Sequence, residues 1–201
     1  MLDISYYVNS VSMNVSKIVG IIAKARHYLE LKNLKELYNT MVYPYLTYCN
    51  INWASTYPNR LRRLRCIYIA LRKLVKLTTF SSFRETSQPL FKLLKIMNIC
   101  EINLYLIANF MYLHYYGKRP EIFGNYFVKN DSKHSYNTRS APKIHIDFKR
   151  TNHGKFTLQY RGAIIWNSLP NDLKEVKSSN AFKKALRTHV QSAKNTLWYL
   201  D

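Results

Sequence analysis

Residues 37–77, LYNTMVYPYLTYCNINWASTYPNRLRRLRCIYIALRKLVKL, decide the fold and the chemistry expected of this chain. The first part of the stretch is aromatic and nearly uncharged, and the second part has the pattern of an amphipathic helix. At about 100° per residue its apolar side chains fall within roughly 140° of the helix surface, which is wide enough to face a core. These side chains are Leu61, Leu64, Ile67, Tyr68, Leu71, Leu74 and Val75.

The opposite face of this helix is basic and carries Arg62, Arg65, Arg72, Lys73 and Lys76. A solvated charged face is the commoner explanation for such a pattern. Here, however, no acidic residue lies between Asn59 and Phe83 to form pairs four residues apart. Because like charges on one face repel one another, the pattern favours an anionic partner. These five residues are the predicted nucleic-acid-binding residues.

Composition supports the same partner. The chain has 201 residues, enough for one domain with a core or for one domain plus a small appendage. A hydrophobic content of 47% argues against wholesale disorder. Its 31 Lys and Arg against 11 Asp and Glu give a formal net charge of +20. Nucleic acid is therefore the first partner to expect, and an anionic membrane surface the second.

Hydrophobic periodicity predicts helices over most of the first 124 residues. One helix follows from the three- and four-residue spacing of Val8, Val11, Val15, Ile18, Val19, Ile22, Ala25 and Leu29. A second begins near Asn33, with a kink or break expected at Pro44, and buries Leu34, Leu37, Tyr38, Met41, Tyr45, Tyr48 and Cys49. A short helix starts at Pro89. The segment 102–116 is apolar all round, which predicts the most buried helix, ending at Gly117.

The pattern changes after Gly124. Residues 125–160 predict an irregular connector with short strands near 143–148 and 155–159, and residues 161–201 a small helical region. In that region a short helix spans 161–166, with Trp166 as an anchor, and a longer one starts near Ala181, capped by Ser179 or Asn180, with Phe182, Leu186 and Val190 inward. The expected fold is mainly α: a helical bundle over 1–124 with a small irregular, mixed C-terminal appendage.

Two further groups of residues have alternative interpretations. Tyr43, Tyr45, Tyr48, Trp53 and Tyr57 suit stacking on single-stranded bases, but their helical spacing favours core packing. A secondary basic set suits either a wider binding surface or solvated loops; it comprises Lys118, Arg119, Lys129, Lys133, Arg139 and Lys143.

Signatures of catalysis are missing from the sequence. It contains no Gly-rich phosphate loop, H-E-x-x-H, G-x-S-x-G or C-x-x-C motif. Two-metal phosphoryl transfer needs carboxylates that converge on ions about 4 Å apart, whereas the aspartates are isolated: Asp3, Asp131, Asp147, Asp172 and Asp201. His145 and His153 are expected on a loop surface and not at a metal. We predict no catalytic residue, no metal site and no cofactor.

Cysteine usage and hydropathy indicate the compartment. Cys49, Cys66 and Cys100 are scattered, so we expect reduced core thiols in an intracellular protein, cytoplasmic or nuclear. The start of the chain lacks a secretory signal pattern. The longest uncharged stretch, 102–116, is shorter than the ~20 apolar residues that a membrane-spanning helix needs.

Several blocks of the sequence occur in an order that resembles a known family. They are the stretch 37–64, PLFKLLKIMNI at 89–99, FMYLHYYGKRPEIF at 110–123, HSYNTRSAPK at 134–143 and GKFTLQYRGAIIWNSLPNDLK at 154–174. Together they are similar to the C-terminal part of non-LTR (LINE-type) retrotransposon reverse transcriptases of the jockey-related group. The resemblance covers nearly the whole chain.

The resemblance implies that residues 1–124 form a thumb that grips a template–primer duplex. The family's endonuclease, fingers and palm, with the aspartate pair that holds catalytic metal, have no counterpart in this sequence. We therefore expect a truncated element copy or partial gene model, which is not an enzyme on its own. Its expected partners are nucleic-acid backbones, with low sequence specificity, and a palm domain or full-length reverse transcriptase in trans. The alternative is a basic helical interaction protein that binds an anionic membrane surface or an acidic protein.

Overall fold

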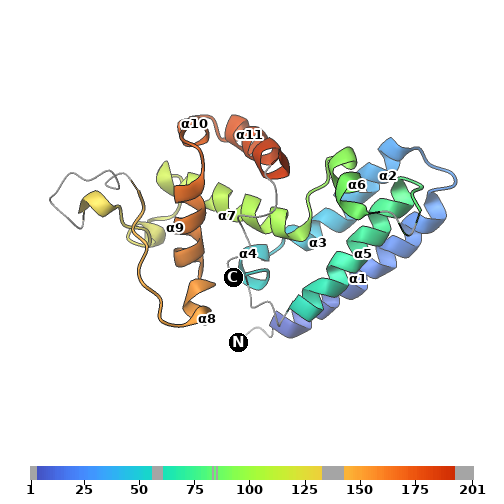
Figure 1. Cartoon of the computed structure of the whole chain (residues 1–201), viewed down its shortest axis with the longest axis horizontal. Coiled ribbons are helices and arrows are strands. Elements are labelled where there is room, and N and C mark those ends of the chain that lie inside the picture. Colours follow the sequence, from blue (N-terminus) through green and yellow to red (C-terminus); the bar gives the residue numbers. More distant parts are fainter. Residues whose placement is uncertain (1–3, 56–60, 83, 85, 133–142, 193–201) are drawn as a thin grey trace. The chain divides into compact units, whose positions relative to one another are not determined.

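The computed structural model of the chain describes residues 4–55, 61–82, 84, 86–132 and 143–192, with the backbone alone at 4–5, 61–68, 88 and 152. These residues form helices joined by turns and loops (Figure 1). Within them the β-type pairing is limited to an isolated antiparallel bridge between Lys129 and Ile144. The predicted mainly α class is confirmed. The chain divides into two compact units, Met1–Asn103 (unit 1) and Leu104–Asp201 (unit 2).

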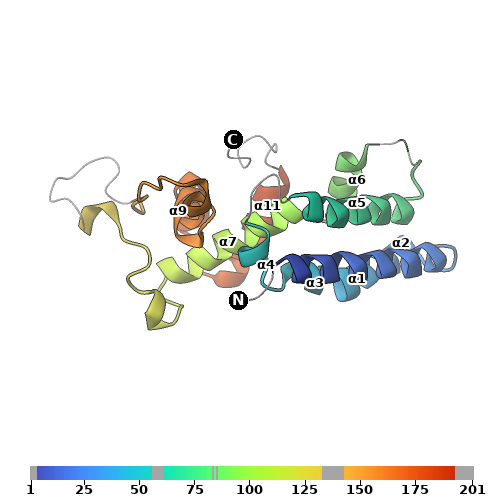
Figure 2. The same cartoon turned by 90° about the horizontal axis from the view of Figure 1, so that it is seen from below.

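Two parallel helices form the centre of unit 1. α1 (Ile4–Ala25) and α5 (Leu61–Thr78) lie side by side (Figure 2). The guanidinium of Arg26 lies 5.5 Å from the ring centroid of Phe80, so the C-terminal ends of the two helices are together. α1 buries six members of the predicted stripe: Val8, Val11, Val15, Ile18, Val19 and Ile22. The periodicity therefore predicted this helix correctly.

The second helical run contains a π-helical turn. α2 (Leu31–Leu37), η1 (Tyr38–Val42) and α3 (Tyr43–Thr47) follow one another without a break. The disturbance expected at Pro44 takes the form of η1, where the Tyr43 N–H donates to the Tyr38 carbonyl five residues back. Pro44, which has no N–H to donate, then lies in the first turn of α3. The buried side chains along this run are spaced four apart: Leu34, Tyr38, Val42 and Leu46.

The buried face predicted for this run is wrong at Tyr45, Tyr48 and Cys49, which are exposed. A π-helical turn holds more residues than an α-helical turn, so each side chain advances by a smaller angle. Side chains four residues apart therefore stay on the face toward the core. In an ideal α-helix, successive side chains at this spacing would move progressively away from that face. The same exposure corrects the expectation of core thiols, since Cys49 and Cys100 are exposed. The Cys66 side chain lies outside the description.

α4 and α6 complete unit 1. α4 (Asn50–Trp53) buries Asn50 and Trp53. α6 (Ser87–Leu94) packs on α5 with Leu90, Phe91 and Leu94 buried, and Pro89 lies in its first turn as predicted.

α7 (Ile99–Tyr115) is the apolar helix expected from the sequence, and its residues belong to both units. At its start the Asn98 side chain accepts the N–H groups of Cys100 and Glu101, while the Glu101 carboxylate accepts the Asn98 N–H. This reciprocal arrangement is a capping box. At its end Gly117 has φ +65, and Lys118 N–H donates to the Leu113 carbonyl over 2.8 Å. The predicted glycine cap is confirmed.

Unit 2 gathers short helices on the rest of α7. They are η3 (Glu121–Phe123), η4 (Asn130–Ser132), α8 (Asn152–Lys155), α9 (Leu158–Ser168), α10 (Asn171–Lys174) and α11 (Ser179–Ser192). α11 buries Phe182, Leu186 and Val190, as predicted, and Phe182 stacks on Tyr112 of α7 with centroids 4.0 Å apart. Trp166 of α9 is buried beside Tyr115, which confirms it as an anchor.

Two expectations for the C-terminal part differ from the structure. The strand expected at 155–159 is wrong, because α8 ends at Lys155 and α9 begins at Leu158. Thr151 and Thr157 cap these helices by accepting the N–H groups of Gly154 and Tyr160, a side-chain role that strand propensity does not register. Of the strand expected at 143–148, Ile144 alone pairs in a bridge. The two compact units meet at Asn103, within α7.

Candidate nucleic-acid interface

In the part of α5 whose side chains are described, from Ile69 to Thr78, an apolar face lies opposite a basic one. Leu71, Leu74 and Val75 have no exposed surface (0% each), while Arg72 and Lys73 between them are exposed. Burial on one side holds the helix in place and fixes which side chains face outward. The structure therefore brings these two predicted residues together on the surface.

Lys76 departs from the prediction, because only 9% of its surface is exposed. It lies in the last turn of α5, where the chain reverses at Phe80 and Ser81 N–H donates back to the Lys76 carbonyl. α6 also returns to pack on α5. Helical spacing puts Lys76 on the same side of α5 as Arg72, but it carries no information on the segment that follows the helix. We remove Lys76 from the candidate interface.

Arg62 and Arg65 lie on the first turns of α5, and their side chains are outside the description. Their backbone positions still matter. Residues seven apart on an α-helix point within about 20° of one another, so Arg65 and Arg72 share a face of this continuous helix. We define the α5 basic face as Arg62, Arg65, Arg72 and Lys73.

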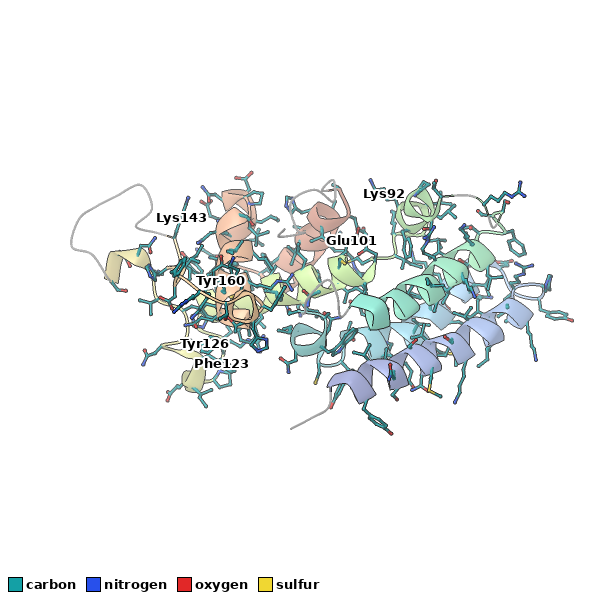
Figure 3. The ribbon with its side chains drawn as sticks, turned by 60° about the horizontal axis from the view of Figure 1, so that its bottom comes forward. Lys92, Glu101, Phe123, Tyr126, Lys143 and Tyr160 are labelled. Carbon is teal, nitrogen blue, oxygen red and sulfur yellow. The ribbon has the colours of Figure 1, made fainter. Side chains whose placement is uncertain are left out.

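The chain carries further exposed basic residues after α5. Arg84, Lys92 and Lys95 are exposed after α5 and on or beside α6 (Figure 3 labels Lys92). Lys92 lies near enough to Glu101 to act on its pKa, which burial raises and which the Asn98 hydrogen bond and Lys92 lower in part. From Leu37 to Arg84 the sequence has no Asp or Glu. An anion approaching α5 thus meets little opposing charge.

The described members of the secondary basic set have different surroundings. Lys118 and Lys143 are exposed, whereas Arg119 packs over the Phe110 ring, with its guanidinium carbon 4.0 Å from the centroid. Burial lowers the pKa of Arg119. The Lys129 ammonium lies 5.1 Å from the Tyr115 ring centroid. Lys133 and Arg139 lie outside the described residues.

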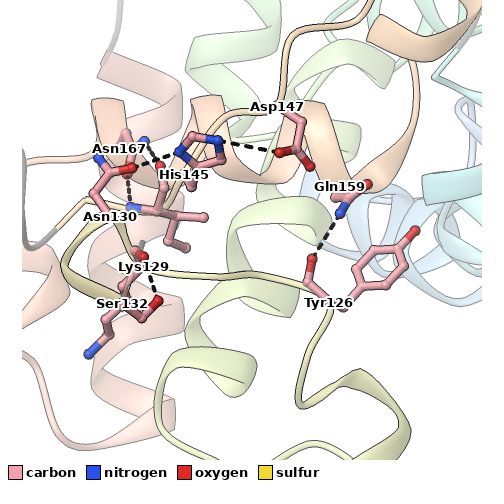
Figure 4. A network of polar contacts seen from close by, with 9 residues as sticks. Tyr126, Lys129, Asn130, Ser132, His145, Asp147, Gln159 and Asn167 are labelled. Atoms are coloured by element: carbon pink, nitrogen blue, oxygen red, sulfur yellow. Dashed lines mark hydrogen bonds and ion pairs between the residues drawn. The ribbon is translucent and has the colours of Figure 1, made fainter. Parts of the chain in front are cut away.

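His145 belongs to a polar network that holds the segment 143–147 in place (Figure 4). Its Nδ1 lies 3.0 Å from Asn130 Oδ1, and its Nε2 lies 3.3 Å from Asp147 Oδ1. The Asn167 side chain accepts the Ile144 N–H and donates to the Ile144 carbonyl, which fastens this segment to α9. His153 is exposed. Among the residues that the structure describes, no group of three or more His, Cys, Asp or Glu side chains is suited to hold a metal ion.

The described aromatic residues between 43 and 57 are partly buried and partly exposed. Trp53 is buried, as core packing predicts, and its indole N–H donates to the Tyr48 carbonyl over 2.8 Å. Tyr45 and Tyr48 are exposed, so core packing is wrong for them. Tyr57 lies outside the description. The missed signal is Cys49, which takes a left-handed conformation (φ 48) that sequence periodicity does not predict.

None of the helices in the described part of the chain has the length and apolar character required to cross a membrane. Comparison with protein-family models, with curated proteins and with solved structures found no match.

Proposed function

We propose that this chain is a thumb-like fragment of a retrotransposon reverse transcriptase that binds nucleic-acid backbones through the α5 basic face. The observation that carries the proposal is the exposure of Arg72 and Lys73 beside the fully buried Leu71, Leu74 and Val75. The net charge of +20 and the order of the sequence blocks support it. Phosphate contacts of this kind position a protein without reading bases, so sequence specificity is low.

The burial of the apolar face favours nucleic acid over the alternative of an anionic membrane. A helix that binds a membrane surface places its apolar side among the acyl chains. In α5 that side is already packed in unit 1. Duplex DNA and vesicles of anionic lipid, compared at the same salt concentration, separate the two. Binding to vesicles alone would overturn the proposal.

The proposed role is binding without catalysis. Of the described aspartates, Asp131 lies in η4, Asp172 in α10, and Asp147 beside His145. Polymerase chemistry needs two metal ions held by neighbouring carboxylates. We expect no template-dependent nucleotide incorporation by the purified chain. A palm domain or full-length enzyme, in the cytoplasm or nucleus, would supply that chemistry in trans.

The test is the salt dependence of duplex binding. Four phosphate contacts give a slope of log K against log salt of about −3 to −4. Arg72→Gln with Lys73→Gln should flatten the slope by about two, because two contacts are lost. The matched control is Lys17→Gln with Lys24→Gln, which removes the same charge from exposed positions of α1. Equal slopes for the two double variants would show that charge alone, and not this face, drives binding.

A further inference from the structure

Tyr48 forms a tight corner between two helices of unit 1. α3 ends at Thr47, Tyr48 is extended (φ −62, ψ 122), Cys49 is left-handed (φ 48, ψ 22), and α4 starts at Asn50. This backbone path turns the Tyr48 ring away from the core, and 66% of the residue is exposed. Tyr45, one turn earlier on α3, is 40% exposed.

The backbone of this corner is nevertheless held firmly. The Tyr48 carbonyl accepts hydrogen bonds from the Trp53 indole at 2.8 Å and from the Tyr7 hydroxyl at 3.3 Å. The Tyr48 N–H donates to the Pro44 carbonyl. The rings of Tyr7 and Tyr48 lie 5.9 Å apart between centroids. An exposed ring on a fixed backbone loses little conformational freedom when a ligand covers it.

The corner lies at the arginine-rich end of α5. Tyr7 of α1 contacts both Tyr48 and Trp53. α1 and α5 are parallel with Arg26 beside Phe80, so 18 residues earlier Arg62 lies about level with Val8, because both helices rise 1.5 Å per residue. The sequence has no acidic residue between Asp3 and Glu30 or from Leu37 to Arg84. An exposed aromatic ring thus shares this end of unit 1 with the first arginines of α5.

We propose that the Tyr48 ring stacks on a base of single-stranded nucleic acid whose phosphates contact the start of α5. The inference rests on the proposed function and adds a substrate class to it. Every base has a π-face, so stacking tolerates any sequence while it selects unpaired bases over paired ones. Positively charged grooves combined with aromatic platforms are the general means of holding single strands. Tyr48 supplies the platform and α5 the charge.

The experiment compares an oligothymidylate with an abasic strand of equal length, which keeps the phosphates and lacks the bases. Tyr48→Leu leaves the carbonyl that anchors Tyr7 and Trp53, and it should weaken oligothymidylate binding about fivefold or more. Abasic binding and the salt slope should stay as in the parent. Tyr48→Phe, which keeps the aromatic ring, should bind oligothymidylate as tightly as the parent. Tyr28→Leu, which replaces an 89% exposed tyrosine beyond the other end of α1, is the matched control and should change neither.

The outcomes distinguish this inference from the proposed function. Unchanged oligothymidylate affinity in Tyr48→Leu, with a salt slope that still depends on Arg72 and Lys73, overturns the stacking and leaves the α5 interface standing. Equal losses on the base-bearing and abasic strands overturn the stacking as well, since the ring would then act through the fold. Failure of the parent chain to bind any strand or duplex overturns both.

Discussion

The side-chain amide of Asn103 in α7 donates a hydrogen bond to the side-chain oxygen of Asn50 in α4, 3.0 Å away, with both residues buried. The Asn50 amide in turn donates to the Leu46 carbonyl over 2.7 Å. Two asparagines far apart in the sequence thus join the first part of α7 to the start of α4. Buried polar groups of this kind are costly when one partner is lost.

Asn103→Ala should therefore destabilise the chain by about 1–3 kcal/mol, because it leaves Asn50 Oδ1 buried without its donor. Urea denaturation measures the change. In Asn50→Ala with Asn103→Ala the loss should be smaller than the sum of the single losses, since each single change already breaks the pair. Additive losses would contradict a direct coupling.

The Glu101 cap should make stability depend on pH. Burial raises the pKa of Glu101 above its ordinary value of 4.5. The folded state then holds the proton more tightly than the unfolded chain, so this contribution is complete below the ordinary pKa and is lost as pH rises through the folded pKa. Glu101→Gln keeps an acceptor for the Asn98 N–H and removes the titration. From pH 4 to pH 7 the urea midpoint of the parent should fall relative to that of Glu101→Gln. A difference that does not change with pH would show that the titration of Glu101 does not affect stability.

Gly162 and Gly20 should respond in opposite directions to alanine. A Cβ at Gly162 would lie 2.7 Å from Met111 Sδ and 3.2 Å from Phe127 Cε1, whereas at Gly20 nothing lies within 4 Å. Overpacking at Gly162 should destabilise the fold by about 1–3 kcal/mol. At Gly20, alanine should stabilise the helix by up to about 1 kcal/mol, because alanine has a higher helix propensity than glycine. We expect Gly162→Ala to lower the thermal midpoint and Gly20→Ala to raise it. A higher thermal midpoint for Gly162→Ala as well would show that α9 can move away from α7.

Lys76 and Lys73 offer a paired test of the corrected interface. Lys73→Gln should flatten the salt slope of duplex binding by about 0.9, because one exposed cation is lost. Lys76→Gln removes the same charge three residues later from a side chain that is 9% exposed, so the slope should stay unchanged. Titration of both variants across salt concentrations gives the answer. Equal flattening would return Lys76 to the interface.

Periodicity predicted those elements whose burial follows from one regular face. The stripe from Val8 to Ile22, the face of α11 and the glycine cap at Gly117 are all local patterns, and the structure contains each of them. The capping box at Asn98 and Glu101 could also have been found, because an N-cap residue followed three positions later by Glu is a sequence signature. The stronger apolar pattern that follows it makes this signature easy to overlook.

The missed features depend on contacts between distant segments. The exposure of Tyr48 follows from the left-handed Cys49 and from hydrogen bonds to Tyr7 and Trp53. The burial of Lys76 depends on what the chain does after α5 has ended. Both affect the candidate site, and neither is encoded in the spacing of apolar residues.

The parallel pairing of α1 with α5 has a consequence for synthesis on the ribosome. The contact between Arg26 and Phe80 joins residues 54 positions apart, and translation at about 5–20 residues per second separates their synthesis by roughly 3–11 s. Throughout that interval the apolar stripe of α1 has no α5 to cover it. We expect a nascent chain that ends before α5 to recruit holding chaperones, and one that extends past Phe80 to release them.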